Sequence, residues 1–128
     1  MHPSKGTAPA HVSLDTTNHL LHVTNYDFES GTYAAYKLDK DTGAITENIF
    51  VDNFTSEIEI GLQDQKASHA HQTVTHNNFI YVVDLGLNKI IHYQVMYNIP
   101  NIKCTKFSSV IWILSNGCFE YQKFLYRS

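Results

Sequence analysis

Short apolar runs alternate with polar turns through residues 1–95, a pattern typical of antiparallel β-structure. Two of these runs are "HLLHVTNY" (His19–Tyr26) and "FIYVVDL" (Phe79–Leu85), which are rich in leucine, β-branched and aromatic residues. No window longer than ten residues in this part has a clean 3.6-residue period. We therefore expect strands throughout residues 1–95 and almost no helix.

The segments between the apolar runs have turn chemistry. "TTN" (Thr16–Asn18) and "HNN" (His76–Asn78) predict tight turns, because asparagine tolerates a positive φ and bonds its own backbone. "LDKDTGAI" (Leu38–Ile45) predicts a hairpin with Gly43 in the left-handed position, followed by a further strand. The next connection is longer, and its alternation at Glu57–Ile60 is compatible with an edge strand.

The chain also repeats itself. Ala10–Tyr26 and Ala70–Leu85 both read Ala-His, a short alternating run, a polar turn, and an apolar run ending near Asn or Asp. A third apolar run follows each of them. A period of about 60 residues indicates repeated supersecondary units. In this alignment the equivalent pairs are His11 with His71 and Asn25 with Asp84.

Four short antiparallel strands per repeat are typical of a β-propeller blade. We predict an all-β fold in which residues 10–52 form one four-stranded blade and residues 69–95 form three strands of a second. The alternative is a small β-sandwich or meander. Residues i and i+2 of a strand face the same side, so His69 and His71 should point together into the propeller channel if their strand begins at Ser68.

Composition changes abruptly near Val95. Residues 1–95 hold all eight histidines and carry 5 Lys/Arg against 11 Asp/Glu, whereas residues 96–128 carry 4 against 1. We therefore divide the chain into a propeller part, residues 1–97, and an unrelated tail, residues 98–128, that should pack poorly. The uncharged run "SSVIWIL" in this tail should favour aggregation if it is exposed.

Several classes of function are disfavoured. No Lys/Arg stripe is present, so nucleic acid is a poor candidate partner. The longest apolar run, Val110–Leu114, is too short to cross a membrane, and the N-terminus lacks the apolar region of a secretory signal. Cys104 and Cys118 form no recognisable disulfide or metal framework. We expect a monomeric, cytoplasmic protein.

Four motifs in residues 5–95 carry a family resemblance. They are a Pro-x-His opening one blade, a Leu-x-Val-x-Asn-Tyr strand end, a His-x-His opening the next blade, and a Tyr-Val-x-Asp-Leu-Gly strand end. The matching residues are Pro9, His11, Asn25, Tyr26, His69, His71, Asp84, Leu85 and Gly86. The sequence thus resembles the lactonase family of seven-bladed β-propellers, which includes 6-phosphogluconolactonases and fungal carboxymuconate-cyclising enzymes. On this basis the chain supplies about one and a half blades.

The resemblance implies a lactone hydrolase of carbohydrate metabolism, with 6-phosphogluconolactone as substrate and no cofactor. A carboxymuconate-type lactonising cycloisomerase and a non-catalytic interaction module are the alternatives. Such hydrolysis needs a base for water and donors for the developing oxyanion. In the carboxymuconate-cyclising branch the resemblance places a catalytic histidine at His71, and His69 is a second candidate. Weaker candidates for substrate contact are His11, Asn25 and Asp84.

Structural roles compete with these assignments. His11 recurs with the repeat, and Asn25 and Asp84 end equivalent strands, so hydrogen bonding to the backbone is an alternative for all three. A His-x-His metal site would lack a third ligand with suitable spacing. Four other histidines are expected in turns or on sheet surfaces, namely His19, His22, His76 and His92. Four tyrosines are expected to pack on the sheets, namely Tyr26, Tyr36, Tyr81 and Tyr93. Residues 1–95 contain no arginine, so we expect no turnover from this chain alone.

Overall fold

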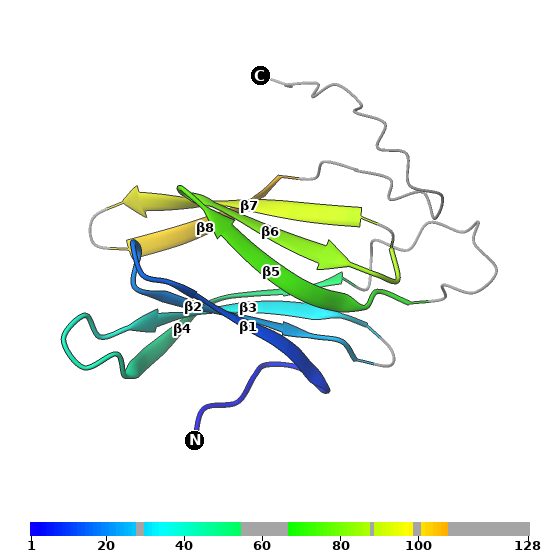
Figure 1. Cartoon of the computed structure of the whole chain (residues 1–128), viewed down its shortest axis with the longest axis horizontal. Helices are drawn as coiled ribbons and strands as arrows, with labels where there is room; N and C mark the ends of the chain where they lie inside the picture. The colour runs from blue at the N-terminus through cyan, green and yellow to red at the C-terminus, as the bar shows by residue number, and fades with distance from the viewer. Residues whose placement is uncertain (28–29, 55–66, 88, 99–100, 108–128) are drawn as a thin grey trace.

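The computed structural model describes residues 1–27, 30–54, 67–87, 89–98 and 101–107. Within these residues the chain forms strands and turns and no α-helix. The strands are β1 (Pro9–Asp15), β2 (Leu20–Asn25), β3 (Thr32–Leu38), β4 (Ile45–Asn53), β5 (Ala70–His76), β6 (Phe79–Asp84), β7 (Lys89–Asn98) and β8 (Asn101–Phe107). They make two antiparallel sheets stacked face to face (Figure 1).

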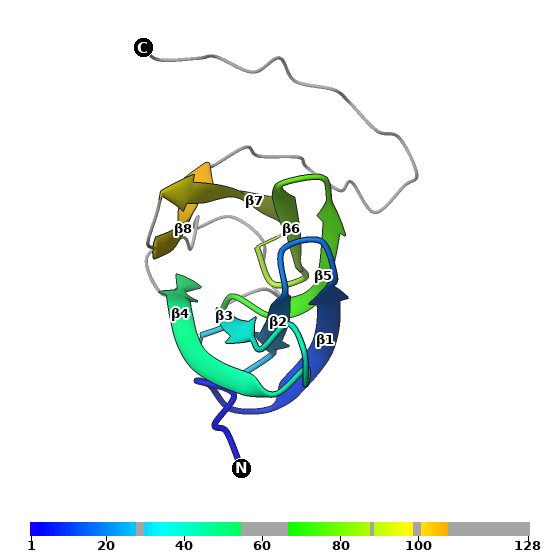
Figure 2. The ribbon, with the colours of Figure 1, turned by 90° about the vertical axis from the view of Figure 1, so that its left-hand side faces the viewer.

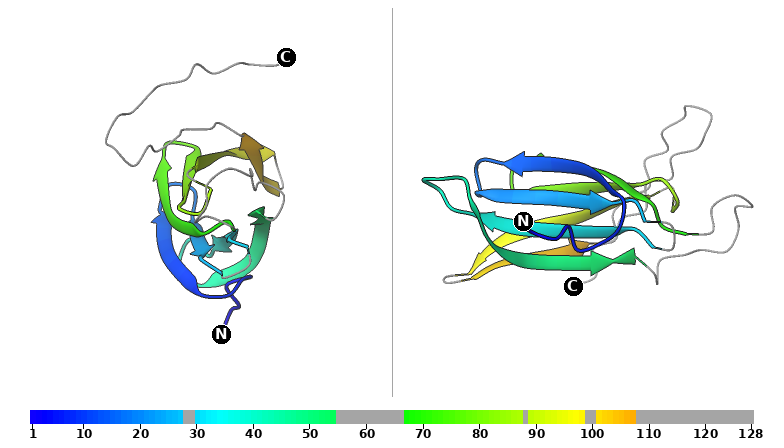
Figure 3. Two further views of the ribbon diagram at one scale, coloured as in Figure 1. Left: turned by 90° about the vertical axis from the view of Figure 1, so that its right-hand side faces the viewer. Right: turned by 90° about the horizontal axis from the view of Figure 1, so that it is seen from below.

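Each sheet has four strands in chain order, β1-β2-β3-β4 and β5-β6-β7-β8, so every strand pairs with its sequence neighbour. This up-and-down arrangement is that of a propeller blade. The prediction of an all-β fold is confirmed, and so are the four strands in residues 10–52 and the three in residues 69–95. In the views of Figure 2 and Figure 3, β1 of the first sheet lies beside β5 of the second.

The second sheet extends further than predicted. β7 continues past Val95 to Asn98, and β8 pairs with it from His92↔Phe107 to Asn98↔Asn101. The expected boundary after residue 97 therefore leaves out the fourth strand of this sheet. The change in composition alters the side chains, whereas strand pairing depends on backbone groups that every non-proline residue carries. Residues 108–128 and the alternation at Glu57–Ile60 lie outside the described residues.

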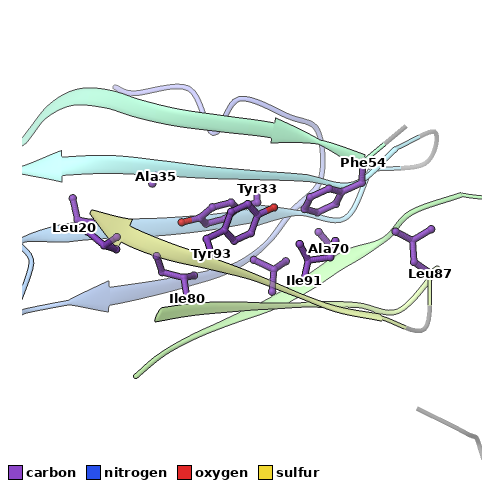
Figure 4. Close-up of a cluster of buried hydrophobic side chains, with 11 residues drawn as sticks. Leu20, Tyr33, Ala35, Phe54, Ala70, Ile80, Leu87, Ile91 and Tyr93 are labelled. Atoms are coloured by element: carbon purple, nitrogen blue, oxygen red, sulfur yellow. The ribbon is translucent and has the colours of Figure 1, made fainter. Parts of the chain in front are cut away.

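The core lies between the two sheets, where aromatic rings from both meet (Figure 4). The ring centroids of Tyr33 and Tyr93 are 4.6 Å apart, and Phe50 packs against both. The Tyr93 hydroxyl donates to Asp52 Oδ2 at 2.9 Å, so this buried ring is also tied to β4. Other buried members are Leu20, Ala35, Phe54, Ala70, Ile80, Val82, Leu87, Ile91 and Val95. This interface holds the two sheets together.

The predicted turns are present, with one difference in detail. Gly43 has φ +71° and Asn77 has φ +54°, as turn chemistry requires. In the β1–β2 turn, however, the left-handed residue is His19, with φ +53°. Asn18 instead donates its backbone N–H to Asp15 Oδ1 at 3.0 Å and its side-chain amide to the other carboxylate oxygen at 2.6 Å.

Strand pairing corrects the alignment of the two repeats. β1 and β5 each carry an irregularity near their start, after which His11 pairs with Thr24 and Gln72 pairs with Val83. His11 is therefore structurally equivalent to Gln72, and His71 is the additional residue at the bulge. Four residues join β1 to β2 whereas two join β5 to β6, which is why simple sequence spacing misaligned the histidines.

Candidate functional site

Polar side chains line the seam where β1 lies beside β5. The Ser13 and Thr73 hydroxyls are 2.5 Å apart, and one donates to the other. His11 Nδ1 accepts a long contact of 3.4 Å from the Thr73 backbone N–H. His11 is therefore placed between the two sheets, where it bridges β1 to β5.

His69 and His71 come together around one aromatic ring, that of Tyr26, which follows β2. The His69 ring stacks on Tyr26, with centroids 4.3 Å apart and planes 8° from parallel. The His71 ring meets the same tyrosine edge-on, with centroids 6.2 Å apart at 78°. Both histidines thus contact the same ring, whereas the condition for the predicted same-side arrangement, a strand beginning at Ser68, is not met because β5 begins at Ala70.

The two histidines differ in how firmly they are held. His69 is half-buried, and its Nδ1 lies 2.9 Å from the Asp27 carbonyl and 3.2 Å from the Tyr26 carbonyl. Asp27, two residues after the end of β2, has a left-handed φ of +43°. His71 is exposed, and its side chain makes no hydrogen bond within the described residues.

Asp84, at the end of β6, fixes the backbone on which His69 sits. The carboxylate is fully buried. Its Oδ1 accepts the backbone N–H of His69 at 2.9 Å and that of Leu87 at 2.8 Å, and its Oδ2 accepts the Ser68 hydroxyl. The His69 carbonyl in turn accepts the backbone N–H of Leu85 at 2.9 Å. Asp84 therefore holds the segment that carries the histidine.

Asn25 has a comparable place at the end of β2. Its amide donates to the Ser4 carbonyl at 2.9 Å and to the Thr32 hydroxyl at 2.8 Å. Its Oδ1 is buried and has no hydrogen-bond partner within the described part of the chain. These contacts tie the N-terminal segment to β3.

His22 is not the surface histidine that the sequence predicted. It is fully buried, and its Nδ1 lies 2.9 Å from the Tyr33 hydroxyl. Burial lowers its pKa to about 4, and the negative charge of Asp15 opposes this shift. The prediction failed because β2 is a central strand whose His22 face packs on the second sheet. The other three predicted surface histidines, His19, His76 and His92, are exposed or half-buried.

Position 86 requires glycine because the backbone of residues 67–69 passes close to it, beside the site. A Cβ at this position would lie 1.9 Å from the Ala67 carbonyl oxygen and 2.9 Å from the His69 backbone nitrogen. We expect Gly86→Ala to lower the free energy of unfolding by about 1–3 kcal/mol, because the backbone must shift to relieve this overlap. The midpoint of urea unfolding of Gly86→Ala, compared with that of the wild type, measures this loss, and Lys40→Ala at an exposed position is the control. Equal midpoints for the two variants would contradict the crowding seen here.

The sequence profile described as "Lactonase, 7-bladed beta-propeller" matches residues 1–109. This range contains both sheets, the histidine pair and the residues that hold it. The chain belongs to the lactonase family of seven-bladed β-propellers. The lactonase match also reaches beyond β8, in agreement with the pairing of that strand. No curated protein and no solved structure gave a match.

Chemically, the residues around Tyr26 offer two imidazole groups. The sequence has one arginine, Arg127, which lies outside the described residues. Within the described ranges, no three His, Cys, Asp or Glu side chains are grouped to hold a metal ion. In the same ranges there is also no helix with the length and hydropathy needed to cross a bilayer. The imidazoles around Tyr26 can therefore accept a proton, and no arginine accompanies them among the described residues.

Tyr26 is a candidate site residue that the sequence pattern did not reveal. It was expected to pack on the sheet like the other tyrosines, whereas its ring contacts both histidines of the second sheet. A signal was available, because Tyr26 ends one of the motifs that carry the family resemblance. Its partner could not be found from that signal, since the contact joins residues more than forty positions apart.

Proposed function

We propose that the histidine pair around Tyr26 supplies the base of a lactone-hydrolysing site, acting on a sugar-derived lactone such as 6-phosphogluconolactone in the cytoplasm. The observation that carries this proposal is the convergence of His69 and His71 on one ring at the start of β5 in a lactonase propeller. An imidazole can accept a proton near neutral pH, which suits it to activating water.

The reaction needs no cofactor. A histidine accepts a proton as the water oxygen bonds to the lactone carbonyl carbon, which gives a tetrahedral intermediate with a negative oxygen. The bond from this carbon to the ring oxygen then breaks, and the ring oxygen takes a proton to become the hydroxyl of the open hydroxy acid. The negative oxygen needs hydrogen-bond donors or cations, which typically contribute about 10²–10³ in rate per donor.

The two sheets supply imidazole groups for the base but no arginine for the negative oxygen. The family has seven blades, and the described residues form two four-stranded sheets, so they do not include the groups that the other blades of a closed propeller would contribute. No arginine occurs in residues 1–126 to bind a phosphate or the developing oxyanion. We therefore propose that the purified chain has the base of the site but not a complete pocket.

The test compares the purified chain with a fusion in which residues 1–107 replace the first two blades of an active lactonase propeller. We expect no hydrolysis of 6-phosphogluconolactone by the chain above the uncatalysed rate, and clear hydrolysis by the fusion. Turnover by the chain alone would contradict the incomplete pocket. A folded but inactive fusion would contradict the proposed base, and activity on a carboxymuconate-type lactone instead would change the substrate.

A further inference from the structure

We propose that the first sheet selects which histidine is the base. Tyr26 is a positioning residue, and together with the two carbonyls at the end of β2 it holds His69 as the neutral tautomer protonated on Nδ1. Its Nε2 is then the atom that accepts the proton from water. The catalytic part of this inference rests on the proposed function, whereas the tautomer and its cause do not.

The hydrogen bonds of His69 determine where its proton lies. The two atoms near Nδ1, at 2.9 and 3.2 Å, are the carbonyl oxygens of Asp27 and Tyr26, and carbonyl oxygens only accept. Nδ1 must therefore donate. A neutral imidazole has one ring N–H, so Nε2 keeps its lone pair and can serve as a base.

The orientation of the His69 ring is also restricted. Stacking at 4.3 Å and 8° on Tyr26 fixes the ring plane, and the bonds to the strand-end carbonyls fix its rotation. Asp84 and Leu85 hold the backbone of the same residue through its N–H and carbonyl. A base fixed on both its backbone and its ring needs little reorganisation to react.

His71 has none of these restraints. It is the additional residue of a bulge, its side chain is exposed, and its contact with Tyr26 is through the ring edge. Family resemblance points to His71 as the catalytic histidine, but the geometry points to His69. It follows that the base directly precedes β5 of the second sheet, while the groups that orient its ring directly follow β2 of the first, so the site forms only when the two sheets are docked.

Nitrogen NMR on the ¹⁵N-labelled 128-residue chain tests this directly. Long-range ¹H–¹⁵N correlations, recorded at a pH where the imidazoles are neutral, report which ring nitrogen carries the proton. We expect His69 to be protonated on Nδ1, and His71 and the exposed His76 to show the Nε2-protonated form that free histidine favours. A His69 protonated on Nε2 would overturn the inference.

Substitutions of Tyr26 test its positioning role. Tyr26→Phe should leave the His69 tautomer unchanged, because the stacked ring is kept. Tyr26→Leu should shift His69 toward the tautomer mixture of His76, and the dispersion of the amide signals shows whether this variant is folded. If folded Tyr26→Leu keeps the wild-type tautomer, Tyr26 does not position His69. If Tyr26→Leu unfolds, the wild-type and Tyr26→Phe spectra still decide the tautomer.

These outcomes are separable from those of the proposed function, since none of them requires turnover. If His69 is protonated on Nδ1 but the fusion protein is inactive, the proposed lactone hydrolysis is contradicted and the positioning of His69 by the first sheet still holds. If the fusion protein is active but His69 is protonated on Nε2, the positioning of His69 is contradicted and the proposed lactone hydrolysis still holds.

Discussion

Acidification from pH 7 to pH 4 should lower the free energy of unfolding by about 3 kcal/mol through His22 alone. Burial lowers the pKa of this histidine from 6.5 to about 4, so between these values the unfolded chain binds the proton more tightly than the folded chain. The contribution of neutral His22 to the free energy of unfolding is fully present above the pKa of the unfolded chain, 6.5, and is lost as the pH falls toward the pKa of the folded chain, about 4. The cause is the cost of a charged imidazole between the two sheets, beside Tyr33.

Urea unfolding of the wild type and of His22→Phe over this pH range measures the effect. The variant keeps a ring of similar size but cannot titrate, so its stability should fall by about 3 kcal/mol less than that of the wild type. Other groups titrate in both proteins, and their contribution cancels in the difference. The exposed His76→Phe is the matched control and should follow the wild type. Parallel pH curves for the wild type and His22→Phe would show that His22 is not buried as a neutral group.

The fold could be predicted largely because each strand has local signals. Short apolar runs mark β2 and β6, and residues such as Gly43 and Asn77 mark the turns that close the hairpins. The fourth strand of the second sheet was missed for a physical reason. Its residues differ in charge from those before Val95, but β8 is held to β7 by backbone hydrogen bonds that no composition reveals.

The site could be predicted only in part. The His-x-His motif located the pair, but alternation along one strand says nothing about a contact with another sheet, so Tyr26 was assigned to packing. His22 was misplaced because a central strand between two sheets buries side chains that would be exposed in a single sheet. The supposed equivalence of His11 and His71 failed because the β1–β2 turn is two residues longer than the β5–β6 turn, so strand pairing makes His11 equivalent to Gln72.

In the fusion of residues 1–107 with the five further blades of an active lactonase, His69→Ala should reduce kcat/KM about 10²–10⁴-fold. The loss should lie mainly in kcat, because the base acts in the transition state and contributes little to holding the ground state. His71→Ala should reduce the rate by a smaller factor, since its exposed side chain lacks the hydrogen bonds that orient His69. Steady-state hydrolysis of 6-phosphogluconolactone gives both parameters.

His76→Ala is the matched control, since it removes an exposed histidine from the far end of the same strand and should leave both parameters unchanged. Tyr26→Phe should also retain activity, because it keeps the ring that stacks on His69. A larger loss for His71→Ala than for His69→Ala would return the catalytic role to the residue that the family resemblance favours. In that case the stacked and hydrogen-bonded His69 would serve to dock β5 against the end of β2, and the exposed bulge histidine would be the one that meets the substrate.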